Sequence, residues 1–314
     1  MAKYRIHMPQ LHGKTLVADG GLETTLIFRD GVDLPHFAAF VLVASEEGRR
    51  RLKAYFRRHL KIAQARGAGF VLDTPTWRAN PDWGDKLGYD RAGLKRINED
   101  SVGLALELRE EYETADTPCV ISGAIGPRGD GYKAGRMEAG EAEDYHRAQI
   151  ADFAGTQADM VTAYTLNTVN EALGITRAAH SARMPAAIAF TVETDGRLPD
   201  GTTLGAAIDA VDQATGAYPA YYLINCAHPT HFERALDPKA AWFQRIGGIR
   251  ANASTRSHAE LDEATELDAG DPADLGRRYS ELARLMPNVH VLGGCCGTDE
   301  RHIAAICEAV LPAS

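Results

Sequence analysis

Eight short apolar runs, each followed by a longer segment with helical spacing, set the narrowest limit on how this chain can fold. The runs are apolar on both faces, which is typical of parallel strands that are buried on both sides. We expect strands at residues 15–18, 70–73, 119–122, 160–164, 187–192, 221–225, 246–251 and 290–292. We expect helices at residues 46–66, 92–112, 141–157, 169–182, 204–214, 231–236, 272–286 and 300–310, with the weakest pattern at 231–236.

Eight strand–helix units in 314 residues, without a break in composition, predict an α/β fold, the (β/α)8 TIM barrel, as a single domain over residues 1–314. A doubly wound open sheet is the alternative. It would more often carry a glycine-rich phosphate loop after the first strand, and Asp19-Gly20-Gly21-Leu22-Glu23 does not fit that pattern. A barrel also brings the eighth strand back near the sixth, so that residues after both strands can meet at one mouth.

The charge and the apolar runs exclude several classes of function. A net charge of −9 leaves no basic stripe for nucleic acid, and Arg49-Arg50-Arg51 and Arg57-Arg58 alternate with apolar residues as on a solvated helix face. No apolar run approaches the roughly 20 residues that span a bilayer. Residues 1–13 lack the apolar core of a signal peptide. We therefore expect a cytoplasmic protein without nucleic-acid or membrane partners, and a homo-oligomer remains open.

The five cysteines, an odd number on a long chain, do not indicate a disulfide framework. Cys295 and Cys296 are adjacent between glycines, and neighbouring residues of an extended chain point to opposite sides, so a bond between them would need a distorted peptide. Glycines let the backbone turn and bring both sulfurs to one side. Cys226, after the sixth strand, supplies a third thiol. Three thiolates with one open position describe a catalytic zinc site, and small buried hydrophobes are the alternative.

Residues that need a functional explanation follow most of the expected strands at their carboxyl ends, which face the active site in a barrel. They are Asp19-Gly20-Gly21, Asp73-Thr74-Pro75-Thr76-Trp77, Gly126-Pro127, Tyr164-Thr165, Thr191-Val192-Glu193, Asn225-Cys226, Asn252-Ala253-Ser254 and Gly294-Cys295-Cys296. Polar groups, glycines and thiols are therefore expected to converge on one mouth.

With these motifs the chain resembles the homocysteine S-methyltransferase family, relatives of betaine–homocysteine methyltransferase and of the homocysteine-binding part of cobalamin-dependent methionine synthase. The resemblance covers nearly the whole chain in the family's order. The matching segments are Asp19-Gly20-Gly21, Gly126-Pro127, residues 190–198, Asn225-Cys226 and residues 293–298. The last segment, Gly-Gly-Cys-Cys-Gly-Thr, is highly specific when paired with Asn-Cys, whereas Asp-Gly-Gly alone is weak.

The resemblance implies that Cys226, Cys295 and Cys296 hold a zinc ion, and that a thiol such as homocysteine enters as the fourth ligand. It implies that Asp19 and the backbone at Gly20 and Gly21 grip the amino-acid end of that substrate. A turn or helix-cap role is an equal alternative for Asp19 on its own. Because zinc removes the thiol proton, the expected reaction is methyl transfer from an onium donor such as S-methylmethionine, S-adenosylmethionine or betaine, giving methionine. No catalytic residue is expected beyond the zinc site.

An onium donor also requires aromatic faces and acidic groups. The candidate faces are Trp77, Trp83 and Tyr164, although each aromatic residue taken singly is more typical of core packing. The candidate charges are Asp73, Glu23 and Glu193, and Asn225 is a further candidate substrate-binding residue because it precedes Cys226.

The chain departs from the family in two places. Family members commonly carry a glutamate near the end of the fourth strand, which the resemblance assigns to the substrate's amino group, and alignment places Tyr164 there. After the seventh strand, residues 250–254 replace a common Pro-Asn-Ser. A tyrosine cannot supply the charge, so we expect zinc–thiolate chemistry with a changed acceptor or donor.

Other functions and roles remain as alternatives. The methyl group could come from a corrinoid protein on a separate chain. A metal-dependent hydrolase on the same barrel would favour histidines and carboxylates over thiolates, and a zinc- or thiol-binding protein without catalysis is also open. His228, two residues after Cys226, is either a hydrogen-bond partner of the metal site or a loop histidine. Cys119 and Cys307 are interpreted as core residues.

Overall fold

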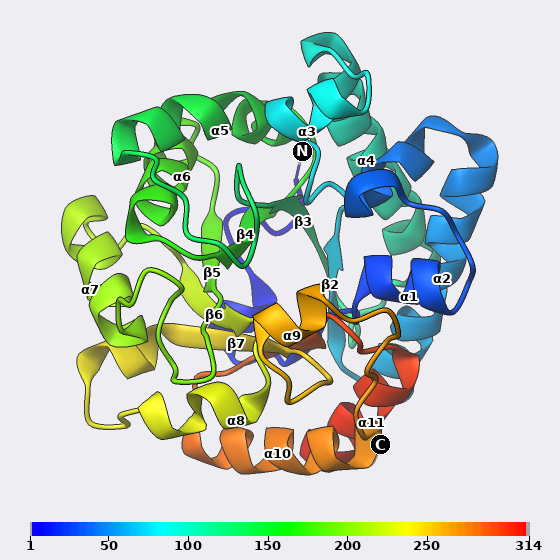
Figure 1. Ribbon diagram of the computed structural model, residues 1–314. Coiled ribbons are helices and arrows are strands. Elements are labelled where there is room, and N and C mark those ends of the chain that lie inside the picture. The colour runs from blue at the N-terminus through cyan, green and yellow to red at the C-terminus, as the bar shows by residue number, and fades with distance from the viewer. Residues whose placement is uncertain (1, 312–314) are drawn as a thin grey trace.

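A computed structural model of the chain describes residues 2–311 as a closed barrel of eight parallel strands in the order β1 to β8, with β8 pairing back to β1 (Figure 1). The strands are β1 (Leu16–Val17), β2 (Gly69–Asp73), β3 (Cys119–Ile125), β4 (Met160–Leu166), β5 (Ala186–Phe190), β6 (Tyr221–Asn225), β7 (Ile246–Ala251) and β8 (Val291–Gly294). The prediction of a single α/β domain with a TIM barrel is confirmed, and the alternative of a doubly wound open sheet is wrong. Residues 1 and 312–314 of the predicted domain lie outside the described range.

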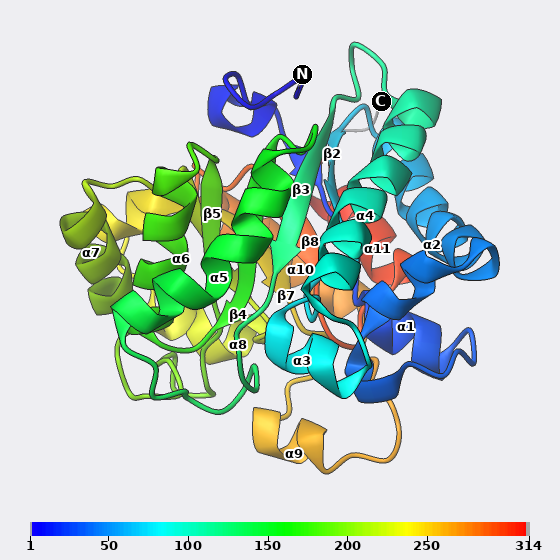
Figure 2. The same cartoon turned by 90° about the horizontal axis from the view of Figure 1, so that it is seen from above.

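Helices surround the barrel, and the long ones cover the strands from outside. The α-helices are α1 (Leu22–Phe28), α2 (Glu46–Ala65), α3 (Pro81–Lys86), α4 (Arg91–Tyr112), α5 (Ala139–Ala154), α6 (Val169–Ser181), α7 (Leu204–Thr215), α8 (Pro229–Phe232), α9 (His258–Asp262), α10 (Pro272–Leu285) and α11 (Glu300–Val310). Short 3-10 helices lie at Pro9–His12, Pro35–Phe37, Ala39–Ala44, Glu233–Ala235 and Ala241–Arg245. Figure 2 shows α3 and α9 at one end of the barrel and the N-terminus at the other.

The alternation of strand side chains separates two buried layers. Val17 and Phe70 belong to the cluster that packs the strands against helices such as α2, and Leu16 and Val71 belong to a smaller cluster inside the barrel. The N-terminal segment reaches the inner cluster, where the amide nitrogen of Gln10 lies 3.4 Å from the Tyr221 hydroxyl. The packed interior leaves the opposite end, the carboxyl ends of the strands, for a site.

Six of the predicted helices begin and end within two residues of the observed ones, α5 ends three residues earlier than predicted, and the short helices differ more. The helix expected at residues 231–236 is instead α8, which Pro229 starts and the His228 side chain caps, followed by one 3-10 turn. The pattern did not predict α1, α3 or α9, since five to seven residues are too few to show a helical period.

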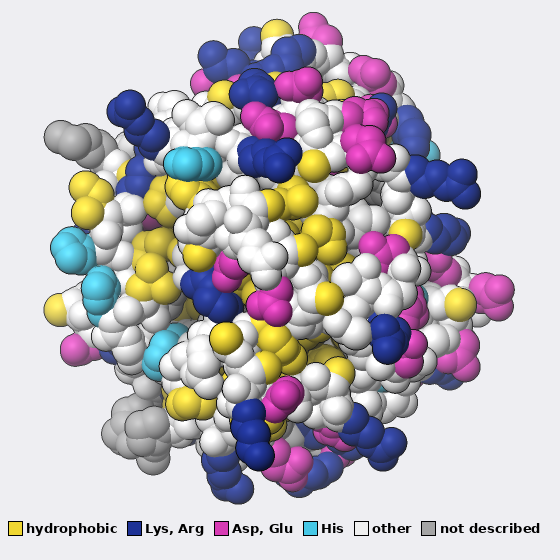
Figure 3. Space-filling model, turned by 90° about the vertical axis from the view of Figure 1, so that its left-hand side faces the viewer, with side chains coloured by type: hydrophobic (Ala, Val, Ile, Leu, Met, Phe, Trp, Pro, Cys, Tyr) yellow, Lys and Arg dark blue, Asp and Glu magenta, His cyan; other side chains and the backbone are white. Residues whose placement is uncertain are grey.

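The surface carries charges of both signs. On the face drawn in Figure 3, basic and acidic side chains are interspersed and form no stripe of one sign. Within residues 2–311, no helix is both long and apolar enough to cross a membrane. A cytoplasmic location and a homo-oligomer stay predictions.

Candidate metal and substrate site

A cavity of about 560 Å³ opens at the carboxyl-terminal mouth of the barrel, a size typical of small-molecule sites. Nearly all the residues that the sequence proposed for the site line it, together with Arg78, Tyr132 and Arg250, which it did not single out. The proposed residues in the lining are Asp19, Gly20, Gly21, Glu23, Asp73, Trp77, Trp83, Tyr164, Asn225, Cys226, Cys295 and Cys296. Glu193 is the exception and does not contribute to the lining.

Strand register brings the three cysteines together. Cys226 follows β6 and Cys295 follows β8, on either side of the end of β7, and each donates its backbone N–H to β7. Cys226 bonds the carbonyl of Arg250 at 3.0 Å, and Cys295 bonds the carbonyl of Ala251 at 2.8 Å. Residues 69 positions apart in sequence therefore face each other across one strand.

The turn after β8 packs against the loop after β1, and two glycines of that loop permit the approach. A Cβ atom on Gly20 would lie 2.8 Å from the Thr298 carbonyl oxygen, and one on Gly21 would lie 2.6 Å from the Cys295 carbonyl oxygen. The Gly21 N–H also donates to the Thr298 carbonyl at 3.0 Å. Gly20 and Gly21 therefore fix the position of the cysteine turn, whether or not they also contact a substrate.

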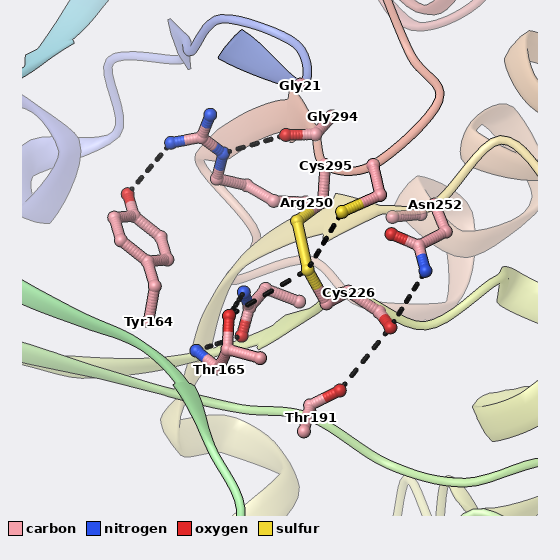
Figure 4. Close-up of a disulfide and its surroundings, with 12 residues drawn as sticks. Gly21, Tyr164, Thr165, Thr191, Cys226, Arg250, Asn252, Gly294 and Cys295 are labelled. Carbon is pink, nitrogen blue, oxygen red and sulfur yellow. Dashed lines mark hydrogen bonds between the residues drawn. A yellow bond between two sulfur atoms is a disulfide. The ribbon is translucent and has the colours of Figure 1, made fainter. Parts of the chain in front are cut away.

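The three cysteine sulfurs form a compact group, which we call the thiol centre (Cys226, Cys295 and Cys296). All three sulfurs lie within 4.8 Å of one another. Cys226 and Cys295 are joined by a disulfide (Figure 4), while Cys296 is free. The adjacent pair is not bonded to each other, as expected, but the expectation of three free thiolates is not met in this structure. The reason is the short distance across β7, where the two Cα atoms lie 5.3 Å apart, within the usual range for a disulfide.

The donor set of the thiol centre fits a zinc ion once the disulfide is reduced. Zinc bonds thiolate sulfur at about 2.3 Å, which places the sulfurs of a tetrahedral site roughly 3.8 Å apart. The Cys226 and Cys296 sulfurs are separated by 4.0 Å. Three soft ligands also leave one tetrahedral position open, as in catalytic rather than structural zinc sites.

The backbone at Cys226 is held in an uncommon conformation by its neighbours. Cys226 has a φ of 52°, in the left-handed region that costs a non-glycine residue conformational energy. Its carbonyl accepts hydrogen bonds from Asn252 at 3.0 Å, His258 at 2.7 Å and Thr191 at 3.4 Å. Figure 4 shows the Asn252 and Thr191 side chains pointing to this carbonyl. These bonds aim the sulfur into the cavity.

Asn225, a predicted substrate-binding residue, is engaged with the protein. Its side-chain oxygen accepts from the Thr165 N–H at 3.0 Å, and its amide nitrogen donates to the Thr165 hydroxyl, also at 3.0 Å. The Thr165 hydroxyl in turn lies 3.8 Å from the Cys226 sulfur. The geometry of Asn225 thus supports the end of β4 beside the thiol centre.

Glu193 acts on the thiol centre through a histidine. Its carboxylate lies 3.0 Å from Nδ1 of His258, the residue that bonds the Cys226 carbonyl. The Tyr132 ring stacks on His258 with centroids 4.0 Å apart, and its hydroxyl donates to the Cys296 sulfur at 3.5 Å. Burial raises the pKa of the Cys296 thiol, while the Tyr132 hydrogen bond lowers it.

The hydrogen bonds of the His228 side chain within residues 2–311 go to Thr230 and not to the cysteine sulfurs. Its Nδ1 accepts from the Thr230 N–H at 3.3 Å as the cap of α8, and burial lowers the pKa of its imidazole to about 4. The histidine beside the thiol centre is His258 instead. Cys119 and Cys307 are buried and free, which confirms their interpretation as core residues.

Beside the thiol centre, four side chains form what we call the arginine cluster (Asp19, Asp73, Tyr164 and Arg250). Arg250 ion-pairs with Asp19 and, at 2.5 Å, with Asp73, and its Nε donates to the Gly294 carbonyl at 3.0 Å. The Tyr164 hydroxyl donates to Asp73 at 2.7 Å. Burial raises the pKa of the Asp73 carboxyl to about 6, although Arg250 lowers it.

All three aromatic faces proposed for a cationic donor have a protein cation over them. The Arg78 guanidinium lies 4.8 Å from the Trp77 ring centre and 3.7 Å from that of Trp83, which Lys86 also approaches to 3.8 Å. Arg250 lies 4.9 Å from the Tyr164 ring centre. The sequence could not reveal this, since cation–π pairs depend on tertiary packing.

The fold and the site together define a (β/α)8 barrel protein with clustered thiols at its carboxyl-terminal mouth. The family model described as homocysteine S-methyltransferase matches residues 16–310, so the chain belongs to that family and is an enzyme of it. The predicted resemblance is therefore confirmed. A search of curated proteins gave no significant match.

Solved structures with the same fold include the homocysteine methyltransferase MmuM from Escherichia coli in three forms. The metallated form is 21% identical with a TM-score of 0.71, covering 96% of this chain and 98% of that one. The oxidized form is 24% identical with a TM-score of 0.69, covering 93% and 94%. The apo form is 22% identical with a TM-score of 0.66, covering 96% and 99%. At these identities the likeness shows the fold.

Proposed function

We propose that this chain is a zinc-dependent S-methyltransferase that moves a methyl group from a small onium donor to a thiol. The observation that supports it most is the convergence of three cysteine sulfurs within 4.8 Å at the mouth of a barrel of the homocysteine S-methyltransferase family. In the reduced protein Cys226, Cys295 and Cys296 would hold the zinc ion, which would leave a position open for the acceptor sulfur. The acceptor that the family name gives is homocysteine, with methionine as its product.

The chemistry is a direct displacement at carbon. A bound zinc ion lowers the pKa of the acceptor thiol and keeps its sulfur as a thiolate at neutral pH. The sulfur forms a bond to the methyl carbon while the bond from that carbon to the onium sulfur or nitrogen breaks. The electron pair of the broken bond leaves with the donor, which becomes a neutral thioether or tertiary amine.

Glu23 is the residue that we assign to the positive charge of the donor. Of the three acidic residues proposed for this role, Asp73 is paired with Arg250 and Glu193 with His258, whereas Glu23 lines the cavity without an ion pair to any of residues 2–311. Glu23 follows Gly20 and Gly21, the glycines that pack against the turn that carries Cys295 and Cys296. A half-buried carboxylate attracts a cation more strongly than one in water, because screening is weaker.

The test is methyl transfer on reduced, zinc-loaded protein, followed by mass spectrometry. Homocysteine and simpler thiols are offered with S-methylmethionine, S-adenosylmethionine and betaine in turn. We expect a methylated thiol with at least one donor and none after zinc removal. Protein with one zinc per chain that methylates no thiol from any of these donors would contradict the proposal, and would favour a corrinoid donor or a binding protein without catalysis.

A further inference from the structure

The arginine cluster leaves no hydrogen-bonding capacity on Arg250. Nε donates to the Gly294 carbonyl, Nη1 to Asp73 and to the Tyr164 hydroxyl at 3.1 Å, and Nη2 to the Asp19 side chain and carbonyl. The side chain of Arg250 is only 8% exposed. A guanidinium with its donors satisfied and its charge paired is a fixed part of the cavity floor.

The carboxylate oxygens of this cluster are either bonded within the protein or fully buried. One oxygen of Asp19 pairs with Arg250, and the other accepts from the Tyr55 hydroxyl at 3.0 Å. Oδ2 of Asp73 accepts from both Arg250 and Tyr164, whereas its Oδ1 has no hydrogen-bond partner among residues 2–311 but is fully buried. Because the one oxygen without a partner is fully buried, an ammonium group placed here would reach no free acceptor on either carboxylate, and it would lie close to a guanidinium of the same sign.

Arg78, which also lines the cavity, differs from Arg250 because its donors are not hydrogen-bonded. Among residues 2–311 it has no ion pair and no hydrogen bond, and its Nε and Nη1 are buried without a partner. It lies over the rings of Trp77 and Trp83, and Glu23 and Asp130 act on it only through their charge. A partly buried cation without a hydrogen-bonded anion is costly, so an anionic ligand would relieve the cost.

From these two observations we propose, on the basis of the proposed function, that the acceptor is a small thiol that carries an anionic group such as a carboxylate and no ammonium group. Arg78 binds the anionic group, and the arginine cluster excludes a cationic amine near the thiol centre. Glu23 remains for the onium charge of the donor. Arg78 and Arg250 are thus specificity-determining residues of the methyl-transfer site.

Four thiols that share a three-carbon chain separate the effect of the carboxylate from that of the ammonium group. Homocysteine carries both, 4-mercaptobutyrate lacks the amine, 3-aminopropanethiol lacks the carboxylate, and propanethiol lacks both. Their dissociation constants are measured by calorimetry on reduced, zinc-loaded protein, and kcat/KM is measured with the active donor. We expect the dissociation constant of 4-mercaptobutyrate to be lower than that of homocysteine by about tenfold or more, and 3-aminopropanethiol to bind most weakly. Homocysteine binding as tightly as 4-mercaptobutyrate, or more tightly, would overturn the proposal.

Arg78→Met tests the carboxylate contact, and Lys86→Met is its matched control. Lys86 also lies over Trp83 but does not line the cavity. We expect Arg78→Met to lose about tenfold of the preference for 4-mercaptobutyrate over propanethiol, and Lys86→Met to keep it. Equal preferences in both variants would overturn the role of Arg78. If Arg78→Met does not fold, Arg78→Gln is used, and the four thiols on the unmodified protein still decide the exclusion of the amine.

The two proposals can fail separately. Selective binding of 4-mercaptobutyrate without methyl transfer from any donor would reject the proposed function and keep the assignment of the cavity charges. Methyl transfer with homocysteine preferred would keep the proposed function and reject the inference.

Discussion

The thiol centre and the arginine cluster are neighbours at the mouth of one barrel, yet the protein treats them in opposite ways. At the thiol centre, side chains such as Asn252 and His258 bond the backbone carbonyl of Cys226, so that reduction of the Cys226–Cys295 disulfide frees the sulfurs to face the cavity. In the arginine cluster, the functional groups themselves bond one another. The difference teaches that lining a cavity is not enough to bind a ligand. A residue is available to a ligand where its backbone makes the bonds that hold it in place and its side-chain functional atoms stay free.

The largest expected effect comes from the thiol centre. Cys296→Ser removes one of three thiolates, so the affinity for zinc and the rate of methyl transfer should each fall by ~100-fold or more. Even the loss of a residue that only hydrogen-bonds a metal ligand costs about 10–100-fold. Zinc content by mass spectrometry and turnover are measured together on reduced protein. Cys307→Ala, in the buried face of α11, is the control and should keep both. Zinc retained with full activity in Cys296→Ser would contradict the metal assignment.

The next effect is on stability and comes from the arginine cluster. Arg250→Met leaves Asp19 and Asp73 buried without a counter-ion, which should cost about 3–5 kcal/mol in free energy of unfolding at pH 7. The cost should shrink at pH 5, because protonation removes the buried charge of Asp73, whose pKa is already raised to about 6. Urea unfolding at both pH values measures it. Arg277→Met, which breaks only surface pairs with Asp274 and Glu281, should change little, and an equal loss in both variants would refute the pairing.

The sequence predicted the thiol centre better than the arginine cluster. Cys226 and the Cys295–Cys296 pair stand after apolar runs, and the barrel topology alone brings the ends of β6 and β8 together. Arg250 stood out only as part of residues 250–254, which depart from the family pattern, and nothing in the sequence named its partners. Its partners Asp19 and Asp73 lie 231 and 177 residues away, so only the tertiary structure identifies them.

The residues around the thiol centre show the same limit. Glu193 follows β5 as predicted, but its contact with His258 depends on α9, whose five residues carry no helical period. Tyr132 lies in the irregular segment between β3 and α5, and no pattern in that segment points to Cys296. Arg78 directly follows the segment 73–77, one of those that the sequence predicts at the mouth of the barrel. That two of its guanidinium nitrogens are buried without a hydrogen-bond partner is visible only in the folded structure.

A smaller effect is expected from the hydroxyl that contacts the thiol centre. Tyr132→Phe removes the donor 3.5 Å from the Cys296 sulfur and keeps the ring that stacks on His258. Hydrogen bonds around a metal site orient its ligands, so the affinity for zinc should fall about tenfold, as measured by competition with a chelator. Tyr145→Phe serves as the control, because the Tyr145 hydroxyl donates to Asn80 at 2.8 Å and not to a cysteine. Unchanged affinity in Tyr132→Phe would show that this contact is incidental.

The smallest effect concerns Glu23 and the pH dependence of stability. Burial raises the pKa of its carboxyl from 4.5 to about 7. The folded protein therefore binds this proton more tightly than the unfolded chain, and the resulting stability is present below pH 4.5 and is lost as the pH rises to about 7. Glu23→Gln should gain on the order of 1 kcal/mol relative to the unmodified protein between pH 5 and pH 8, measured by urea unfolding without metal. A constant difference across this range would show that Glu23 is ionised normally.

The central claim is that three cysteines hold zinc and that the substrate thiol completes the site. Zinc X-ray absorption counts the sulfur ligands directly, on reduced protein alone and after saturation with 4-mercaptobutyrate or propanethiol. We predict three sulfurs from Cys226, Cys295 and Cys296, and four once a thiol has bound. Fewer than three sulfurs in the protein alone, or a count that no thiol raises, would contradict the account.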